Sequence, residues 1–472
     1  MENKYQLIVI GAGPGGYVAA VRAAQLGFKT AVIDAREAGG TCLNRGCIPT
    51  KSFLHTAELF HEAEANFETL GLHAENVSYD MGKILQRKND VVSRLRGGVE
   101  HLFKVNGIDY LQGTGTIMSN DSVLFTPHEG EKTLLYTDKI LIATGSVPSN
   151  PPVEGMDLPN VITSDELLDM DHLYDHLIVA GAGVIGMEFA FFYNSMGKNV
   201  TIMASRDRIL PKVDKEVAQN LEAVLKQRKV KIVKKARLKK ITKTDDGQLE
   251  CWYLDGEEYK SVKGDGVLLA AGRAPNTKDL FGPGVSVETD EKGAVKVDEN
   301  FVTSMENVYA IGDVIPGTQL AHVASAEGIS AVEHMAGLER STDLSAVPDC
   351  IYTLPEIACV GMTEEAAKEA GLNVRVGKSI MQTNGKSLVA MQTRGFIKVV
   401  YDEDNDRLVG AQLMCARATD IINELSDAIV NKLSKKQLLA VIRPHPTFGE
   451  AINEAIADLD FMAIHGGKKK TK

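Results

Sequence analysis

Two segments of this chain repeat one pattern, and the repeat restricts the possible folds more than any other feature. Residues 7–34 read LIVIGAGPGGYVAAVRAAQLGFKTAVID, and residues 177–204 read LIVAGAGVIGMEFAFFYNSMGKNVTIMA. In both, an apolar strand runs into G-x-G-x-x-G, a helix of small and apolar residues follows and stops at a glycine, and a second strand closes the unit. Such a loop lets a pyrophosphate approach closely and lie at the helix N-terminus. Two units in the same register predict two bound dinucleotides.

The pattern also indicates which residues form the two nucleotide sites. The first unit ends at Asp34, whose carboxylate would accept hydrogen bonds from an adenosine ribose. The loop residues expected beside the phosphates are Gly11, Gly13 and Gly16 in the first unit and Gly181, Gly183, Val184, Ile185 and Gly186 in the second.

The rest of the chain predicts an α/β protein with a further domain. A length of 472 residues suggests about three domains of roughly 150 residues each. Residues 45–146 contain a long helical stretch and then short strands. Strands end in glycine at Gly145, Gly272 and Gly312, and open α/β sheets bind ligands at such carboxyl ends. From about residue 346, strands joined by turns and then helices predict a separate α+β domain.

Composition and charge exclude several classes of protein. Hydrophobic residues make up 44% and charged residues 24% of the chain, as in ordinary globular proteins. The longest apolar runs fall short of the ~18 residues that a membrane span needs, and we expect no targeting segment before the first strand. We therefore expect a cytoplasmic protein. A net charge of −11 argues against nucleic acid as the main partner, and the basic end GKKKTK is interpreted as a solvated tail.

A pair of cysteines follows the first nucleotide unit. Cys42 and Cys47 lie in GGTCLNRGCIPTK, five positions apart at the expected start of a helix, and Lys51 lies four residues after Cys47. A helix N-terminus and a nearby ammonium group both stabilise a thiolate, so these thiols are predicted to be redox-active. The other four cysteines are expected to be reduced, mostly buried thiols, namely Cys251, Cys350, Cys359 and Cys415.

A histidine near the C-terminus is a candidate base. His445 and Glu450 occur in RPHPTFGE, and a histidine held by a carboxylate accepts protons near neutral pH. The flanking prolines, Pro444 and Pro446, predict a rigid, non-helical segment. Taken locally, an ordinary turn histidine is the alternative interpretation.

Together these residues resemble the flavin-dependent pyridine nucleotide–disulfide oxidoreductases, in particular the branch that oxidises dihydrolipoamide. The resemblance runs from residue 5 to about 460. The motifs that carry it are GGTCLNRGCIPTK, ATGS at 143–146, GRAPNT at 272–277, IGD at 311–313, LAH at 320–322 and HPTFGE at 445–450.

The resemblance implies two Rossmann-like domains, one for FAD and one for NAD(P), and a C-terminal α+β dimerisation domain. The expected boundaries are 1–146 and 271–345 for the FAD and central domain, 147–270 for the NAD(P) domain and 346–472 for dimerisation. No metal is expected. Besides the glycine loops and Asp34, the residues that match cofactor contacts are Gly40, Thr41, Lys51, Gly115, Thr144, Gly145, Asp313, Leu320, Ala321, His322, Glu188, Ser205, Arg206, Gly272 and Arg273.

The resemblance also implies roles for the catalytic residues. Cys42 would exchange with the substrate dithiol, Cys47 would lie against the flavin, and Lys51 would lie near its edge. His445, paired with Glu450, would take the proton from dihydrolipoamide and would come from the other subunit of a homodimer. The implied partner is a lipoyl-bearing subunit of a 2-oxoacid dehydrogenase or glycine cleavage system, and the implied process is cell redox homeostasis.

Three departures from the family pattern affect specificity. Ala204 stands where NAD-using relatives have an acid, and Ser205, Arg206 and Arg208 follow, so that a 2′-phosphate could be received. Gly186, the third glycine of the second loop, still favours NAD. Because the two signals oppose each other, we expect relaxed or NADP-tolerant nucleotide choice. Arg45 lies between the cysteines and could tune their potential. Arg443 and Pro444 replace the usual His-Ala before His445, so the sequence does not determine the shape of the substrate entrance.

Two other functions remain open from the sequence. One is an NADPH-dependent reductase of a small disulfide such as glutathione, which Ala204 and the arginines favour. The other is a non-catalytic flavoprotein subunit or redox sensor. Mercuric and large thioredoxin reductases are disfavoured because no cysteine follows Cys415.

Overall fold

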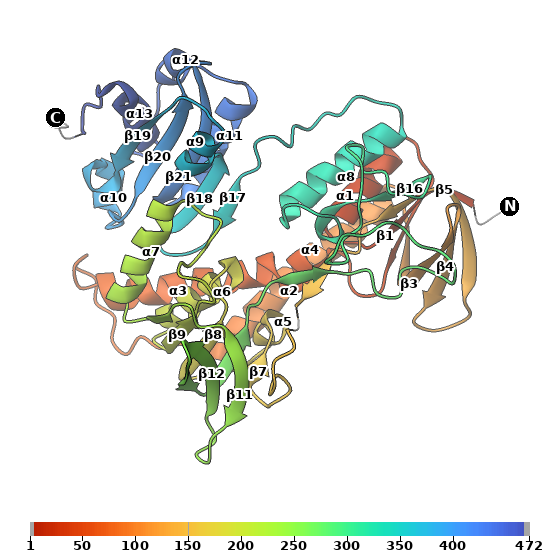
Figure 1. Ribbon diagram of the computed structural model, residues 1–472, viewed down its shortest axis with the longest axis horizontal. Coiled ribbons are helices and arrows are strands. Elements are labelled where there is room, and N and C mark those ends of the chain that lie inside the picture. Colours follow the sequence, from red (N-terminus) through yellow and green to blue (C-terminus); the bar gives the residue numbers. More distant parts are fainter. Residues whose placement is uncertain (1–3, 150, 467–472) are drawn as a thin grey trace. The chain divides into compact units, whose positions relative to one another are not determined.

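The computed structural model describes residues 4–149 and 151–466 (Figure 1). The basic end GKKKTK, residues 467–472, lies outside the described residues. The chain forms two compact units, each assembled from separate segments. The first contains residues 1–152, 161–173 and 268–344, and the second contains 153–160, 174–267 and 345–472.

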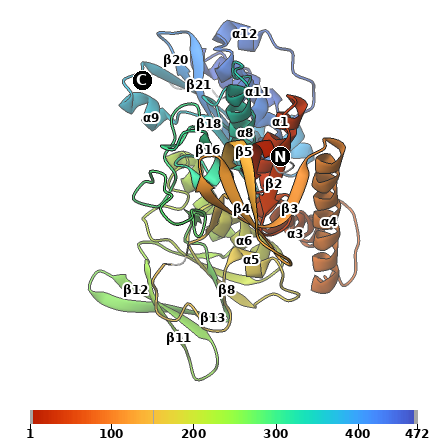
Figure 2. The ribbon, with the colours of Figure 1, turned by 90° about the vertical axis from the view of Figure 1, so that its right-hand side faces the viewer.

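The sheet of the first unit is mostly parallel and carries the first nucleotide unit. Its strand order is β1-β2-β3-β4-β5-β16, and β1 also pairs with β5. Figure 2 labels β2, β3, β4, β5 and β16 of this sheet. β4 is antiparallel to both of its neighbours, whereas β1, β2, β5 and β16 pair in parallel. The strands are β1 (Lys4–Ile10), β2 (Thr30–Asp34), β3 (Asp109–Ser119), β4 (Ser122–Pro127), β5 (Thr133–Ile142) and β16 (Val308–Ala310). The apolar runs at residues 7–10 of β1, 31–33 of β2 and 140–142 of β5 lie in the core of this unit.

Helices of the first unit pack on this sheet and on one another. Gly328 and Gly15 let α1 and α8 approach closely, since a Cβ at Gly328 would lie 2.7 Å from the Gly15 carbonyl oxygen. The helices are α1 (Pro14–Gln25), α2 (Gly40–Arg45), α3 (Cys47–Asn66), α4 (Met81–Val105), α5 (Ser164–Leu167), α8 (Ala321–Met335) and the 3₁₀ turn η1 (Gly312–Val314). Short strands β6 (Ser146–Pro148), β7 (Val161–Ile162) and β15 (Arg273–Pro275) complete the unit.

The second unit contains the second nucleotide unit and a three-stranded antiparallel sheet. β8, β9 and β10 pair in parallel in the order β10-β9-β8, with β14 next to β8. The strands are β8 (His176–Ala180), β9 (Asn199–Met203), β10 (Lys231–Val233) and β14 (Gly266–Leu269), with helices α6 (Val184–Ser195) and α7 (Lys215–Gln227). The antiparallel sheet consists of β11 (Leu238–Lys243), β12 (Leu249–Asp255) and β13 (Glu258–Gly264).

The C-terminal part of the second unit is an antiparallel sheet with helices. Its order is β17-β18-β21-β20-β19, and α11 and α13 pack on it around an apolar core (Figure 1). The strands are β17 (Asp349–Ile351), β18 (Glu356–Gly361), β19 (Val374–Ile380), β20 (Phe396–Asp402) and β21 (Arg407–Cys415). The helices are α9 (Glu364–Glu369), α10 (Gly385–Val389), α11 (Ala418–Val430), α12 (Lys435–Leu439) and α13 (Glu450–Ala457), with 3₁₀ turns η2 (Met381–Thr383) and η3 (Asp458–Asp460).

The two repeated segments adopt the same local structure, as the sequence predicted. Both begin with a parallel strand, continue as a helix of 12 residues and end in the neighbouring parallel strand. The glycines after the helices, Gly27 and Gly197, have φ of 87° and 77°, which the left-handed position at a helix end requires. Within the described part of the chain, no helix is both long and apolar enough to cross a membrane.

Candidate functional site

Each glycine loop contains one glycine that the protein's own packing does not require. A Cβ at Gly16 or Gly186 would lie 1.8 or 2.2 Å from the carbonyl oxygen of the first loop glycine, so these positions must be glycine. By contrast, a Cβ at Gly183 would meet nothing within 4 Å, and its φ of −86° suits any residue. Gly13 has similarly ordinary geometry. The open space beside Gly183, and the absence of any clash at Gly13, where a Cβ would lie 3.9 Å from the Gly40 Cα, leave room for the pyrophosphate of a dinucleotide.

The first turns of the two helices can bind anions. α1 begins after Gly13 and α6 after Gly183, and neither helix has a side-chain cap at its N-terminus. The N–H groups of such a turn carry the positive end of the helix dipole. Both units thus have the donors that a bound dinucleotide needs, one for FAD and one for NAD(P).

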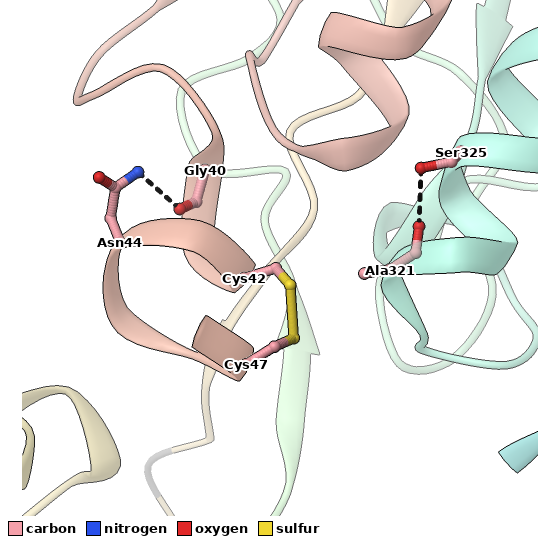
Figure 3. Close-up of a disulfide and its surroundings, with 6 residues drawn as sticks. All are labelled: Gly40, Cys42, Asn44, Cys47, Ala321 and Ser325. Atoms are coloured by element: carbon pink, nitrogen blue, oxygen red, sulfur yellow. Dashed lines mark hydrogen bonds between the residues drawn. A yellow bond between two sulfur atoms is a disulfide. The ribbon is translucent and has the colours of Figure 1, made fainter. Parts of the chain in front are cut away.

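Cys42 and Cys47 form a disulfide (Figure 3). Their Cα atoms are 4.7 Å apart, within the range that disulfides span. Cys42 belongs to the short helix α2, and α3 begins at Cys47, so the predicted position of the pair at a helix start is confirmed. Lys51 lies one turn further along α3. The structure therefore brings the two predicted thiols into one redox-capable bond.

Side chains around the disulfide hold its loop in place. Asn44 donates from Nδ2 to the carbonyl oxygens of Ala38 and Gly40, both at 2.9 Å. Arg45 forms an ion pair with Glu37. Burial raises the pKa of the Glu37 carboxyl, but the charge of Arg45 outweighs this effect and holds the pKa below its usual value. Arg45 is thus engaged with a carboxylate rather than presenting an unpaired charge to the sulfurs.

The remaining cysteines are thiols, as predicted. In the described part of the chain, Cys251, Cys350, Cys359 and Cys415 lie outside any disulfide. Burial raises the pKa of Cys251 to about 12, and it also raises the pKa of Cys359 and Cys415. These three thiols stay protonated at neutral pH and are poor nucleophiles.

Asp34 lies at the end of β2, where the sequence placed it. Its two carboxylate oxygens accept hydrogen bonds from the backbone N–H groups of Ala12 at 2.5 Å and Arg36 at 2.7 Å. Burial raises the pKa of this carboxyl, and the two N–H groups oppose the shift. A carboxylate has about four acceptor sites, so capacity for a ribose hydroxyl remains. Its contact with a ribose stays a prediction.

Asp313 is held by residues from two other segments of the first unit. Ser146 donates from Oγ to Asp313 Oδ2 at 2.5 Å. Arg273 donates from Nε to Ser146 Oγ at 2.7 Å and from Nη2 to the Ser146 carbonyl oxygen at 2.6 Å. Burial lowers the pKa of Arg273, and Asp313 and Asp165 oppose this effect. The predicted cofactor residues Asp313 and Arg273 therefore belong to one network, which Ser146 joins.

A buried carboxyl contacts the turn that contains Asp313. Glu327 of α8 accepts a hydrogen bond from the Gly312 N–H at 2.7 Å. Burial raises its pKa to about 7, and Asp313 adds to the shift. Sequence analysis missed Ser146 and Glu327 as supports of this turn. Ser146 stands inside the ATGS motif and could have been found, whereas Glu327 belongs to none of the motifs.

In the second unit, Glu188 lies on α6 and is only 3% exposed. Its Oε1 accepts a hydrogen bond from the Tyr352 N–H at 3.1 Å. β9 ends at Met203, one residue before Ala204, and Ala204 is fully buried. Arg208 donates from Nη2 to the Pro211 carbonyl oxygen at 2.5 Å, so this arginine is engaged within its own loop.

His445 and Glu450 are brought together, as predicted. Nδ1 of His445 lies 2.8 Å from Glu450 Oε1, and the Thr447 N–H donates to Glu450 Oε2 at 2.8 Å. Glu450 is the first residue of α13. Burial raises the pKa of the Glu450 carboxyl, but the Thr447 N–H and His445 outweigh it and hold the pKa below its usual value. The side chain of His445 is 76% exposed.

Arg443 points into the second unit. Its side chain is 6% exposed, and its guanidinium forms an ion pair with Glu424 of α11. Nη1 donates to Asn453 Oδ1 of α13 at 3.1 Å. Arg443 thus links the segment before His445 to two helices.

The other predicted cofactor residues lie at strand ends and helix starts. Thr144 donates from Oγ1 to the Asn276 carbonyl oxygen at 2.7 Å. Gly115 of β3 packs against Ile33 of β2 and Val123 of β4. Helix α2 begins with Gly40 and Thr41, and α8 begins with Ala321 and His322 after its N-cap Leu320. Positive φ angles occur at Gly145 and Gly272, and β9 is followed by Ala204, Ser205 and Arg206. The start of α8 lies in the surroundings of the disulfide (Figure 3). Their cofactor contacts stay predictions.

Comparison with known proteins extends over both units. The family model described as "Pyridine nucleotide-disulphide oxidoreductase" matches residues 5–328, and the model of the dimerisation domain of that family matches residues 347–456. A dihydrolipoyl dehydrogenase of Bacillus subtilis is 40% identical, and the alignment covers 98% of this chain and 100% of that protein. A mitochondrial dihydrolipoyl dehydrogenase of Pisum sativum is 38% identical over 98% of this chain and 93% of that protein.

A solved structure is similar over the same range. The HOCl-induced flavoprotein disulfide reductase RclA from Escherichia coli is 30% identical and has a TM-score of 0.85. The match covers 96% of this chain and 99% of that one.

Proposed function

Because this chain belongs to the pyridine nucleotide–disulphide oxidoreductase family, we propose that it is a dihydrolipoyl dehydrogenase. It oxidises protein-bound dihydrolipoamide to lipoamide and reduces NAD(P)⁺. The observation that carries the proposal is the Cys42–Cys47 disulfide, which lies at the start of α3 after a dinucleotide-binding unit. Similarity to dihydrolipoyl dehydrogenases over nearly the whole chain supports the choice of substrate.

The thiol pair performs two exchange steps. A thiolate of dihydrolipoamide attacks the sulfur of Cys42, a mixed disulfide forms, and Cys47 leaves as a thiolate. The second sulfur of the substrate then attacks its partner sulfur in the mixed disulfide, and Cys42 leaves with the electron pair. Lipoamide departs as a cyclic disulfide, and two electrons remain on the two cysteines. FAD and NAD(P), when bound, supply the electron transfer that restores the Cys42–Cys47 disulfide.

His445 handles the proton of the attacking thiol. Its Nδ1 faces Glu450 at 2.8 Å, so Nε2 is the nitrogen that accepts the proton of the substrate thiol. Glu450 stays ionised because its pKa is below the usual value, and its charge stabilises the imidazolium that forms. The Thr447 N–H and the N-terminus of α13 hold this carboxylate in place.

We propose that the functional form is a homodimer in which His445 serves the thiol pair of the other subunit. The dimerisation domain at residues 347–456 supports a homodimer. Apolar side chains near His445 and the C-terminus are exposed in the single chain, which supports their burial by a second copy. These are Val441 at 47%, Ile442 at 94%, Phe461 at 70%, Met462 at 68% and Ile464 at 81%.

The proposed partner is a lipoyl-bearing subunit of a 2-oxoacid dehydrogenase or of a glycine cleavage system, and the proposed location is the cytoplasm. The dimer would restore the lipoyl group of that subunit after each acyl or aminomethyl transfer. The names of the relatives support a lipoyl substrate and leave the complex to be chosen by experiment.

Steady-state turnover tests the proposal. The purified flavoprotein is assayed with dihydrolipoamide and NAD⁺ or NADP⁺, and separately with glutathione disulfide and NADPH. We expect dihydrolipoamide turnover, a loss of at least ~10³-fold in Cys42→Ser, and near-normal rates in the matched control Cys350→Ser. Faster reduction of glutathione disulfide would replace the proposal with a small-disulfide reductase. A yellow protein without any turnover would indicate a redox sensor or structural subunit.

A further inference from the structure

Reduction of the disulfide removes the covalent link between α2 and α3. Cys42 belongs to α2, α3 begins at Cys47, and Gly46 lies between the two helices. Helix α2 contains six residues, none of which is fully buried, and Leu43 is its partly buried contact with the apolar core. A helix this short is not stable on its own. Once the disulfide is open, polar contacts of α2 must therefore help to keep Cys42 near Cys47.

Asn44 of α2 takes part in three hydrogen bonds. Its Nδ2 donates to the carbonyl oxygens of Ala38 and Gly40, both at 2.9 Å, and Figure 3 shows the bond to Gly40. Both acceptors belong to the chain segment that leads into α2. The third bond comes from another helix, because Arg96 of α4 donates from Nε to Asn44 Oδ1 at 3.1 Å. Arg96 therefore ties α2 to a helix that is distant in the sequence.

Helix α4 is a firm support for this contact. It contains 25 residues, and its N-cap Asp80 accepts a hydrogen bond from the Lys83 N–H at 3.1 Å. Val92 and Val99, four residues before Arg96 and three residues after it, are buried. These spacings put the three side chains on one face of the helix, and Arg96 itself is partly buried. The face of α4 that packs within the first unit thus presents Arg96 to α2.

Two arginines lie near a carboxylate just before α2. Arg45 forms an ion pair with Glu37. Burial raises the pKa of Glu37, but the charge of Arg45 and, more weakly, that of Arg96 hold it below its usual value. The guanidinium of Arg96 therefore lies near both Asn44 and Glu37, and a carboxylate helps to balance its charge beside the redox loop.

We propose that Arg96 is a positioning residue for the Cys42–Cys47 pair and that it holds α2 in place through Asn44 while the disulfide is open. The inference rests on the proposed function and deepens it, because it concerns the pair that the substrate reduces. The disulfide and the Arg96–Asn44 bond order the same short helix, so each makes the other easier to form. When the disulfide is closed, the bond forms at little entropic cost, whereas with an open disulfide the bond must order α2 itself. Removing the bond therefore favours the dithiol.

The strength of a hydrogen bond from a partly exposed guanidinium sets the size of the effect. We expect its loss to lower the equilibrium constant for closing the disulfide by about 5- to 10-fold, which corresponds to ~20–30 mV for a two-electron couple. With the bond in place, the pair closes its disulfide more readily after each reduction.

Thiol–disulfide equilibration tests the proposal without any catalytic cycle. The oxidised holoenzyme is equilibrated under anaerobic conditions in mixtures of dithiothreitol and its cyclic disulfide. Each exchange opens the Cys42–Cys47 disulfide, produces two protein thiols and closes one dithiothreitol ring. After acid quenching and alkylation, mass spectrometry gives the reduced fraction of the pair. Arg96→Met keeps the apolar stem and removes the donor, so it should reach half-reduction at a ratio of dithiol to disulfide about 5- to 10-fold lower than the parent.

Two further variants are the controls. In Arg96→Gln, Nε2 takes the position of the arginine Nε and keeps a donor for Asn44, so we expect a shift of less than ~3-fold. Arg94→Met makes the same change two residues away, on a different face of α4 where the side chain is exposed, and should behave as the parent. Urea unfolding of both redox states identifies a merely structural arginine, whose loss would lower stability equally in both and leave the thiol equilibrium unchanged.

The outcomes separate this inference from the proposed function. An unshifted equilibrium in Arg96→Met would overturn the inference and leave the proposed function standing. A shift of the same size in Arg96→Gln or in Arg94→Met would overturn the hydrogen bond to Asn44 as the route of the effect. If no mixture reduces the pair in the parent, the disulfide is not redox-active and the proposed function fails as well.

Discussion

Replacing Arg443 with methionine tests whether this arginine anchors the segment of the proposed base or shapes the substrate entrance. Methionine keeps the apolar stem and removes the guanidinium, so packing is largely preserved. In the structure the guanidinium is buried, forms an ion pair with Glu424 and donates to Asn453 Oδ1 at 3.1 Å. Its weaker bonds reach the carbonyl oxygens of Val441 at 3.3 Å and Leu438 at 3.4 Å.

The magnitude follows from the burial of the two partners. Removing one member of a buried ion pair costs about 3–5 kcal/mol. The side chain of Glu424 is 38% exposed and can be rehydrated, which lowers the expected cost to about 2–3 kcal/mol. Opening of the segment around His445 should therefore become roughly 30- to 150-fold more frequent. The side chain of Arg417 is 69% exposed, so the control Arg417→Met should change stability by less than ~0.5 kcal/mol.

Hydrogen exchange and kinetics measure the two consequences separately. We expect faster amide exchange across residues 439–450 and a lower kcat for dihydrolipoamide, with little change in KM, because the base is held less firmly. An altered KM with unchanged exchange would show that Arg443 shapes the entrance and would refute the anchoring argument.

Three further predictions concern the glycine loop and two buried charges. Gly183→Ala should fold with normal stability, since its Cβ meets nothing within 4 Å, yet it should bind nicotinamide nucleotide at least ~10-fold more weakly. Gly186→Ala should lose stability, because its Cβ would lie 2.2 Å from a carbonyl oxygen. Calorimetry measures the nucleotide affinity of each variant, and urea unfolding measures its stability. Burial raises the pKa of Glu327 to about 7 from a usual value of 4.5, so the folded protein retains a proton that the unfolded chain releases. The free energy of unfolding should therefore fall by about 2–3 kcal/mol as the pH rises from about 5 to 7, and a Glu327→Gln variant that keeps the same fall would contradict this account. Lys398→Met leaves the buried Asp214 without its partner at 3.0 Å and should destabilise the second unit by about 3–5 kcal/mol in urea unfolding. The double variant Lys398→Met with Asp214→Asn should lose less, because it removes the unpaired charge and keeps an N-cap for α7.

The sequence predicted the nucleotide units well because their signals are local. A G-x-G-x-x-G loop, its flanking strands and the glycine that ends the helix all lie within 28 residues, and each position has a steric reason. The same holds for Cys42 and Cys47, which lie five positions apart where α2 ends and α3 begins, and for His445 and Glu450, which are also five positions apart. Local spacing therefore indicated which of these side chains meet.

Contacts between distant segments could not be predicted in this way. Ser146 and Asp313 are 167 positions apart, and no periodicity relates them. The Lys235 N–H donates to the Arg206 carbonyl oxygen because β10 pairs with β9, and no local spacing relates these two positions. The Arg443 side chain points inward because it pairs with Glu424 of α11, which lies earlier in the chain. The local sequence therefore could not show whether Arg443 is a buried anchor or a residue of the substrate entrance.

Counting thiols before and after a single turnover tests the central claim most directly. The oxidised flavoprotein is mixed under anaerobic conditions with one equivalent of dihydrolipoamide, quenched in acid, alkylated and mapped by mass spectrometry. Our account predicts that both Cys42 and Cys47 become alkylated only after the substrate is added, while labelling of the four other cysteines does not change. In the contradicting result, Cys42 and Cys47 remain resistant to alkylation, or the newly exposed thiols map to other cysteines. Electrons from the substrate then do not enter through this disulfide, and the proposed chemistry is wrong.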